Sequence, residues 1–437
     1  MGALNNIAIL ERVRDHLDEI RELLGENWPD FIHQLQLSLS ELACAQDEVE
    51  STRLINELIK QCLASRAKDT ILRILEQIQS LDLDNTQSRR AAQDVSPLED
   101  ANSAAMATAA NMLEWVPTRS GDRYHIVPVF FATDRKGLGA EKNPNKFFGG
   151  ARGALSYGLA RVSVPDRHKT GKIERPWRGF SESPEKHVAL LNVEQLELIR
   201  FRERVTEAVK TARQSKILIF VHGYRVSFAE AARTIAQIVF DIDFTGIPFL
   251  YSWPSKGSFF AYSRDENNAA WTREHFLEAI NTLYGIKNIA EQHLLAHSMG
   301  NRVLFQGLQH MHGQRFGQVI LAAPDDDVET FSSQLHRFLG RGERNTLYAS
   351  KKDFALRISN WIHGEMRAGQ LGVAAAGLDT IDASAVNFSL FAHSYFHEQR
   401  ALLGDISLLL EHGLAPDDHR PSIRRHPESE FAWQFQP

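Results

Sequence analysis

Cysteine, long apolar runs and basic stripes are scarce or missing in this 437-residue chain. Its two cysteines, Cys44 and Cys62, have no companion ligands nearby in the sequence, which favours buried free thiols over a disulfide or a metal site. No apolar run approaches the roughly 18 residues of a membrane-spanning helix, and the first residues do not resemble a secretory signal. No basic stripe indicates nucleic-acid binding. We therefore expect a soluble, cytoplasmic protein without a metal, a nucleic-acid partner or an integral membrane segment.

Aromatic residues and glycines are almost absent from the first quarter of the chain. Of the 40 aromatic residues (25 Phe, 8 Tyr, 7 Trp), only Trp28 and Phe31 precede Trp115, and only two of the 27 glycines do. Such a segment lacks the turns and bulky side chains of a sheet. The first 85 residues hold 16 acidic and 8 basic side chains, a net of −8, which leaves +2 of the total of −6 for the rest. The sequence thus predicts a helical first part and a mixed α/β remainder.

Four amphipathic stripes occupy the helical part. Apolar residues recur at spacings of three and four, first between Leu10 and Leu24, and predict a small α-helical bundle over residues 1–84. A polar linker follows over residues 85–120. The bundle either binds a protein partner or self-associates through its acidic surface, or it is an architectural appendage. Its string at residues 28–31 resembles the helical adaptor domains of bacterial conflict-system effectors.

Strand and helix patterns alternate along residues 121–437. Segments 124–133 and 155–164 predict an antiparallel hairpin with a turn over 147–154, and a helix is expected over 193–212. Six short apolar strands separated by helix-length segments follow, which indicates a mostly parallel sheet with helices on both faces. Ligands of such sheets bind at the carboxyl ends of the strands. The six predicted strands are 217–221, 249–253, 293–296, 318–323, 346–349 and 380–383.

A serine stands where one of these strands meets a helix. The strand ends at Ala296, and His297, Ser298, Met299 and Gly300 precede a predicted helix. A strand, a tight turn with small flanking residues and a helix are the context of a nucleophile elbow, in which alanine here replaces the usual first glycine. We predict Ser298 as the nucleophile, with a buried turn serine as the alternative. The N–H of Met299 is expected to contact the oxyanion, and His297 and Gly300 to support the elbow.

A second loop can supply the other oxyanion donor. The most apolar strand, at 216–221, ends in His222, Gly223 and Tyr224, about 75 residues before the serine. Gly223 lets the backbone turn an N–H inward, and we predict that the N–H of Tyr224 completes the oxyanion hole. Each donor is expected to stabilise the transition state by about 3 kcal/mol. His222 is expected to brace the loop rather than to act as a base.

The acid and the base should follow the nucleophile in the chain. Asp353 follows the second strand after that of Ser298 and is the predicted acid, while Asp325, in an aspartate run predicted to cap the next helix, is the alternative. His393 lies after the last predicted strand and is the predicted base, with His397, expected on the following helix, as runner-up. In acyl transfer, His393 takes the serine proton, Asp353 fixes the tautomer of His393, and water hydrolyses the acyl-enzyme.

Six strings stand in order along this larger part, at 129–135 (VFFATDR), 153–158 (GALSYG), 220–226 (FVHGYRV), 251–255 (YSWPS), 296–302 (AHSMGNR) and 393–396 (HSYF). Together they resemble a largely uncharacterised, mainly bacterial family of esterase/lipase-like α/β-hydrolases. The resemblance covers residues 122–410 and leaves the helical quarter uncovered. It implies an α/β-hydrolase fold with Ser298, Asp353 and His393 as the triad, but it does not imply a substrate.

The sequence therefore favours a serine hydrolase that needs no cofactor, acting as a carboxylic ester hydrolase on a small-molecule or lipid ester. Aromatic residues around 253–255 and 262–271 favour an apolar acyl group, although aromatics after a strand also fill cores. One alternative is an effector hydrolase of a bacterial conflict system that attacks lipid under the control of the helical domain. A different class is a non-enzymatic binding module on a degenerate hydrolase fold.

Overall fold

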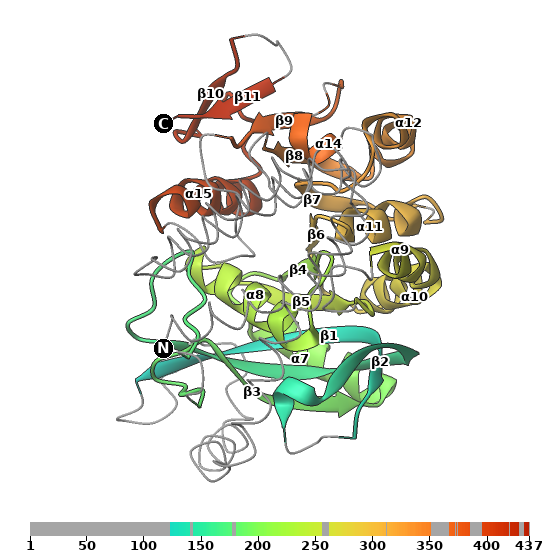
Figure 1. Cartoon of the computed structure of the whole chain (residues 1–437), viewed down its shortest axis with the longest axis vertical. Helices are drawn as coiled ribbons and strands as arrows, with labels where there is room; N and C mark the ends of the chain where they lie inside the picture. The colour runs from blue at the N-terminus through green and yellow to red at the C-terminus, as the bar shows by residue number, and fades with distance from the viewer. Residues whose placement is uncertain are drawn as a thin grey trace, which may run out of the picture. The chain divides into compact units, whose positions relative to one another are not determined.

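The chain is represented by a computed structural model, which describes residues 123–139, 143–176, 181–255, 262–311, 313–350, 367–371, 373, 375–384, 396–418, 420–427 and 432–436 (Figure 1). The predicted bundle over 1–84 and the predicted linker over 85–120 lie outside the described residues. Within the described ranges, no helix is both long and apolar enough to cross a membrane.

One eleven-stranded sheet runs through the described residues, in the order β10-β11-β9-β8-β7-β6-β4-β5-β1-β2-β3 (Figure 1). Neighbouring strands are parallel from β1 to β11. The antiparallel pairs lie at the two edges of the sheet: β1 with β2, β2 with β3, and β10 with β11. The strands are β1 (Tyr124–Gly137), β2 (Phe148–Pro165), β3 (Ala189–Leu196), β4 (Lys216–Val221), β5 (Ile247–Ser252), β6 (Glu291–His297), β7 (Phe316–Ala322), β8 (Gly342–Ala349), β9 (Asp379–Asp382), β10 (Ile423–Arg425) and β11 (Ala432–Phe435).

Two helical layers bury the faces of the sheet. On β4, Leu218 and Phe220 pack toward α8 and α15, whereas Ile217, Ile219 and Val221 pack toward α7, α10, α11 and α12 (Figure 1). The run of residues 217–221 in β4 is apolar at every position because both faces of the strand are covered. The helices are η2 (Pro144–Lys146), α7 (Leu198–Thr211), α8 (Phe228–Asp241), α9 (Tyr262–Trp271), α10 (Arg273–Tyr284), α11 (Gly300–Leu308), α12 (Val328–Phe338), α14 (Ala368–Leu371) and α15 (Phe396–His412).

The six predicted parallel strands are confirmed as β4 to β9, and the predicted hairpin as β1 and β2, with Phe130 opposite Leu159. The turn predicted over 147–154 is wrong, because most of that segment belongs to β2. Gly153 serves close strand packing instead of a turn, since a Cβ there would lie 2.9 Å from the backbone of Arg135. The helix predicted over 193–212 is shorter, because its start pairs with β2 as β3. Strands β10 and β11 were not predicted.

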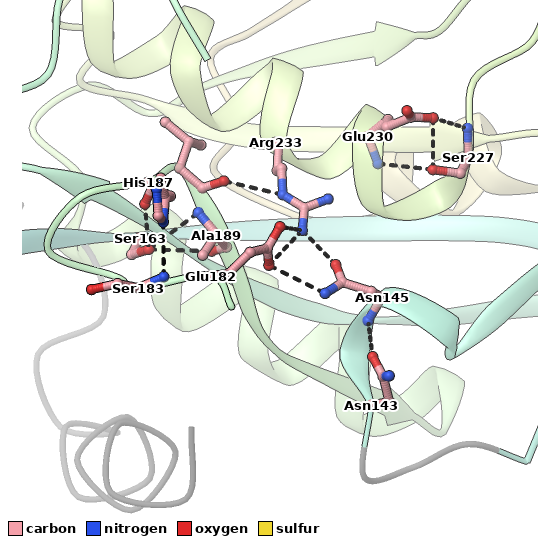
Figure 2. Close-up of polar contacts among 11 residues, drawn as sticks. Asn143, Asn145, Ser163, Glu182, Ser183, His187, Ala189, Ser227, Glu230 and Arg233 are labelled. Atoms are coloured by element: carbon pink, nitrogen blue, oxygen red, sulfur yellow. Dashed lines mark hydrogen bonds and ion pairs between the residues drawn. The ribbon is translucent and has the colours of Figure 1, made fainter. Parts of the chain in front are cut away.

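Polar contacts fix the start of α8, the helix that follows the loop of residues 222–226, here called the His222 loop (Figure 2). Ser227 and Glu230 form a capping box, in which each side chain accepts a hydrogen bond from the backbone N–H of the other residue. One turn later, Arg233 donates to Glu182 at 2.7 Å and to Asn145, and so ties the helix to the loop after β2 and to η2 (Figure 2). The loop that leads into α8 therefore ends on an anchored helix.

Candidate active site

The adjacent strands β4 and β6 mark the point in the sheet where the order of the strands changes direction. After β4 the chain passes through α8 to β5 on one side, and after β6 it passes through α11 to β7 on the other. Because α8 and α11 cover opposite faces, the loops at the carboxyl ends of these two strands diverge. Ligand sites of open α/β sheets form at such a switch point. The loop of residues 222–226 and the turn at Ser298 both lie there.

Ser298 occupies a strained turn between β6 and α11. Its φ is +50°, in the left-handed region that costs a residue with a side chain on the order of 1–3 kcal/mol. The serine N–H donates to the carbonyl of Ala322 at 2.9 Å, and the serine carbonyl accepts from the N–H of Asn301 at 3.0 Å and from Asn301 Nδ2 at 2.9 Å. The turn is thus held by hydrogen bonds on both sides of a half-buried serine, which is the geometry of a nucleophile elbow.

Two glycines let the elbow and the His222 loop approach closely. A Cβ at Gly300 would lie 2.5 Å from the carbonyl oxygen of His222, so only glycine fits where α11 begins. A Cβ at Gly223 would lie 3.0 Å from Ser298 Cβ and 2.8 Å from His297 Nδ1. Met299 is the N-cap residue of α11, where helix N–H groups lack partners within the helix. The structure therefore brings the predicted nucleophile and the two predicted oxyanion loops together.

The side chain of His222, the first residue of this loop, is buried. Its Nδ1 lies 2.8 Å from the carbonyl oxygen of Gly223, its Nε2 lies 3.1 Å from Arg135 Nη2, and its ring stacks on Trp253 at 5.3 Å. Burial, together with the charge of Arg135, holds the pKa of His222 well below its ordinary value, so the imidazole is neutral. These contacts suit a brace for the loop better than a base that must reach the serine hydroxyl.

Asp325 lies beside the elbow and is buried. Its backbone N–H is 3.4 Å from the carbonyl oxygen of Ser298, and its Oδ1 is 3.5 Å from Arg367 Nε. The structure thus keeps Asp325 as a candidate acid. Asp353 and His393, the favoured acid and base, lie outside the described residues, and so does the side chain of His397, whose backbone belongs to α15.

The other two aspartates of the run hold the segment that follows β7. Asp327 caps α12 by accepting from the N–H of Thr330 at 2.7 Å, which confirms the predicted N-cap. Asp326 Oδ1 lies 3.2 Å from Arg302 Nε, and burial raises the pKa of Asp326 to about 6, although Arg302 opposes that shift. Arg302 also contacts Glu266 of α9 at 2.6 Å. Helices α9, α11 and α12 are thereby linked next to the elbow.

Several residues around the site were given no role from the sequence. Asn301 and Arg302 stand at the end of the string at 296–302, and Arg135 at the end of the string at 129–135. Their place in these strings was the available sign that they matter. Their roles could not be assigned from it, because their hydrogen-bonding partners lie on other elements. In the part of the chain that the structure describes, no three His, Cys, Asp or Glu side chains are grouped to hold a metal ion.

A mostly parallel sheet, helices on both faces and a serine elbow between a strand and a helix define the α/β-hydrolase fold. Residues 199–410 match the model of a family described as alpha/beta hydrolase of unknown function (DUF900). The match confirms the resemblance to an uncharacterised α/β-hydrolase family and indicates a hydrolase. It begins at α7, so β1 to β3 and Arg135 lie outside it. No curated protein matches the chain.

Proposed function

We propose that the chain is a serine hydrolase that cleaves carboxylic esters through an acyl-enzyme on Ser298. The observation that carries the proposal is the left-handed backbone of Ser298 at the joint of β6 and α11, against Gly223 of the neighbouring loop. A turn serine with only a structural role has no need of a strained conformation that leaves its hydroxyl half-buried at the switch point.

The proposed reaction has two steps. His393 takes the proton of Ser298 Oγ as that oxygen attacks the ester carbonyl carbon, and the carbonyl oxygen becomes an oxyanion that accepts from the N–H groups of Tyr224 and Met299. When the C–O bond of the ester breaks, His393 returns the proton to the departing alcohol. Water, deprotonated by His393, then attacks the acyl carbon. The bond between that carbon and Ser298 Oγ breaks, and His393 returns the proton to Oγ, which releases the acid and restores Ser298. Asp353 holds the imidazole in the required tautomer.

The proposed substrate is a small-molecule or lipid ester. Trp253 gives no support for an apolar acyl pocket, because it is fully buried in the core and stacks on His222. A series of p-nitrophenyl esters of increasing chain length measures the preferred length of the acyl group.

The test of the function is turnover of such esters by matched serine variants. Ser298→Ala should lose activity to the background rate, since no nucleophile is left. Ser333→Ala removes an exposed serine hydroxyl on α12 and should turn over esters as the wild type does. Equal activity of Ser298→Ala and Ser333→Ala would refute the proposed nucleophile.

A further inference from the structure

Arg135, near the carboxyl end of β1, is a buried guanidinium that no carboxylate of the described residues contacts. Burial lowers its pKa to about 10, against the attraction of more distant acidic groups. Within the described part of the chain, the partners of its three nitrogens are neutral groups at 2.6–3.2 Å: the carbonyls of Gly149, Val226 and Ser255, the hydroxyl of Ser252 and Nε2 of His222. A buried charge without a counter-ion is costly, so the contacts that it makes call for an explanation beyond stability.

The contact with His222 fixes a tautomer. A guanidinium carries donors only, so Nε2 of His222 must accept from Arg135. In the neutral ring the proton is then on Nδ1, which donates to the carbonyl oxygen of Gly223 at 2.8 Å. Ser252 is compatible with this state, because its hydroxyl accepts from Arg135 Nε at 2.8 Å and keeps its own proton for Nε2 at 3.2 Å.

The carbonyl of Gly223 and the N–H of Tyr224 belong to one trans peptide, in which the two bonds point in opposite directions. The hydrogen bond that pulls this carbonyl toward the buried ring of His222 therefore turns the N–H of Tyr224 away from the ring. The Cα of Gly223 lies against Ser298. The direction of the predicted oxyanion donor is thus set by a proton on His222.

The neighbouring peptides are held as well. Trp253 Nε1 donates to the carbonyl oxygen of His222 at 2.7 Å, which fixes the preceding peptide. Ser255 Oγ accepts from the N–H of Arg225 at 2.7 Å, which fixes the following one, where Arg225 has a φ of +60°. Three successive peptides of the loop are anchored to the segment after β5 and to His222, and the central one carries the N–H of Tyr224.

We propose that Arg135 is a positioning residue for catalysis: it selects the Nδ1–H tautomer of His222, and that tautomer holds the Gly223–Tyr224 peptide in the orientation that forms the oxyanion hole. The inference rests on the proposed function. With the proton on Nε2 instead, the lone pair of Nδ1 would face the carbonyl oxygen of Gly223, and the peptide would turn to offer its N–H to Nδ1. The donor would then be lost to the transition state.

The tautomer is read by nuclear magnetic resonance, which needs no activity. In the full chain labelled with ¹⁵N-histidine, the ring signals that disappear in His222→Asn belong to His222. Long-range ¹H–¹⁵N correlations should show the proton on Nδ1 in the wild type, and a proton on Nε2 would overturn the proposal. Arg135→Met removes the charged donor to Nε2 and leaves there only the Ser252 hydroxyl, which can accept a hydrogen bond as well as donate one. If that variant folds, its His222 should shift toward the Nε2–H form; an unchanged tautomer would contradict the role of Arg135.

Two His222 variants separate positioning from folding. The amide nitrogen of Asn lies where Nδ1 lies and retains a donor to Gly223, whereas that of Gln lies where Nε2 lies and does not. His222→Gln should lower kcat on p-nitrophenyl acetate about 10²-fold to 10³-fold with KM changed only a few-fold, and His222→Asn should stay within about tenfold of the wild type. Equal losses in the two variants, or wild-type kcat in folded His222→Gln, would overturn the proposal.

Tyr251→Phe is the matched control for stability. It removes a fully buried hydroxyl that contacts Thr272 and Asp134 without touching the His222 loop. Its thermal stability should fall while its kcat stays at the wild-type value. If the wild type itself fails to hydrolyse esters, the proposed function fails, and the wild-type tautomer then decides separately whether His222 holds the loop as inferred.

Discussion

Two buried arginines lie on opposite sides of β6, the strand that leads into Ser298, and their surroundings differ. Arg135, beyond β5 at the end of β1, contacts carbonyls, a hydroxyl and an imidazole. Arg420, beyond β7, donates through Nε to Asp405 Oδ1 at 2.8 Å and also contacts Tyr348 of β8. Burial opposes the charge of both, but Tyr348 and Asp405 outweigh it at Arg420 and raise its pKa, whereas burial prevails at Arg135 and lowers its pKa.

The difference separates two uses of a buried charge. The carboxylate of Asp405 neutralises Arg420, so this pair ties the C-terminal segment to α15 and β8 and serves the fold. We propose that Arg135, which has no such carboxylate partner among the described residues, instead orders the loop that lies against Ser298. We expect changes of the first kind to alter stability and leave turnover per folded molecule intact, and changes of the second kind to alter turnover.

The largest expected effect on turnover concerns the catalytic acid. Asp353 and Asp325 are the two candidates, and of these Asp325 lies among the residues that the structure describes. Asp325 lies next to the elbow but also near the buried Arg367, a structural arrangement like that of Arg420. Asp353→Asn should lower kcat about 10⁴-fold, because the base loses the group that fixes its tautomer, while Asp325→Asn should lower it far less. Ester turnover of the two purified variants measures this. The reverse order would assign the acid to Asp325.

Breaking the Arg420 pair should give the largest loss of stability. Arg420→Met leaves the carboxylate of Asp405 buried without a counter-ion, which should lower the free energy of unfolding by about 3–5 kcal/mol. Arg200→Met, which breaks an ion pair with Glu203 whose side chains are 60% and 57% exposed, should cost about 1 kcal/mol or less. Urea unfolding measures both. Loss of kcat in folded Arg420→Met would place this pair in the catalytic machinery and erase the contrast.

His168 adds a buried cation whose charge depends on pH. Burial lowers the pKa of His168, but hydrogen bonds to Asp241 and Glu174, each at 2.8 Å, outweigh burial and raise it from 6.5 to about 9. Because the folded pKa exceeds the unfolded one, the stabilisation is fully present below about pH 6.5 and is lost as the pH rises through 9. It amounts to on the order of 3 kcal/mol.

Urea unfolding between pH 6 and pH 10 tests that linkage. The difference in unfolding free energy between the wild type and His168→Gln should be largest at the acid end and should shrink toward pH 10. A difference that grows with pH would mean that the folded state holds His168 neutral, and His168 would then resemble Arg135 in lacking effective neutralisation.

The smallest effect is expected at the start of α8, where the His222 loop ends. Ser227→Ala removes the capping box with Glu230 and should destabilise the protein by about 1 kcal/mol, whereas Ser227→Thr keeps a capping oxygen and should restore most of that stability (Figure 2). Thermal unfolding of the three proteins gives the comparison. Loss of stability in Ser227→Thr equal to that in Ser227→Ala would exclude the cap as its source.

Much of the fold follows from local pattern. Both faces of the central strands are buried, so six short apolar runs predicted β4 to β9. The aspartate before α12 predicted the N-cap of that helix. The serine turn was predictable because strand, small residues and helix are adjacent in the chain. Strand β3 was mistaken for the start of a helix, because a short apolar run does not distinguish the two without its partner β2.

Contacts between distant residues were beyond local pattern. Arg135 and His222 are 87 positions apart, and a buried arginine with neutral partners leaves no periodic trace in a sequence. Gly223 was expected to provide backbone freedom and Gly300 to support the elbow as a small residue. In the structure, both are needed because the elbow and the loop pack too closely for a Cβ. Sequence reasoning therefore located the serine turn and the neighbouring loop, but not the residues that hold them.

A fluorophosphonate adduct tests the central claim most directly. The probe phosphonylates an activated serine, and mass spectrometry of the digested full-length protein locates the added mass. The account predicts one adduct, on the peptide that contains Ser298, and none in Ser298→Ala under the same conditions. An adduct on another serine, or none on a folded wild type, would contradict it.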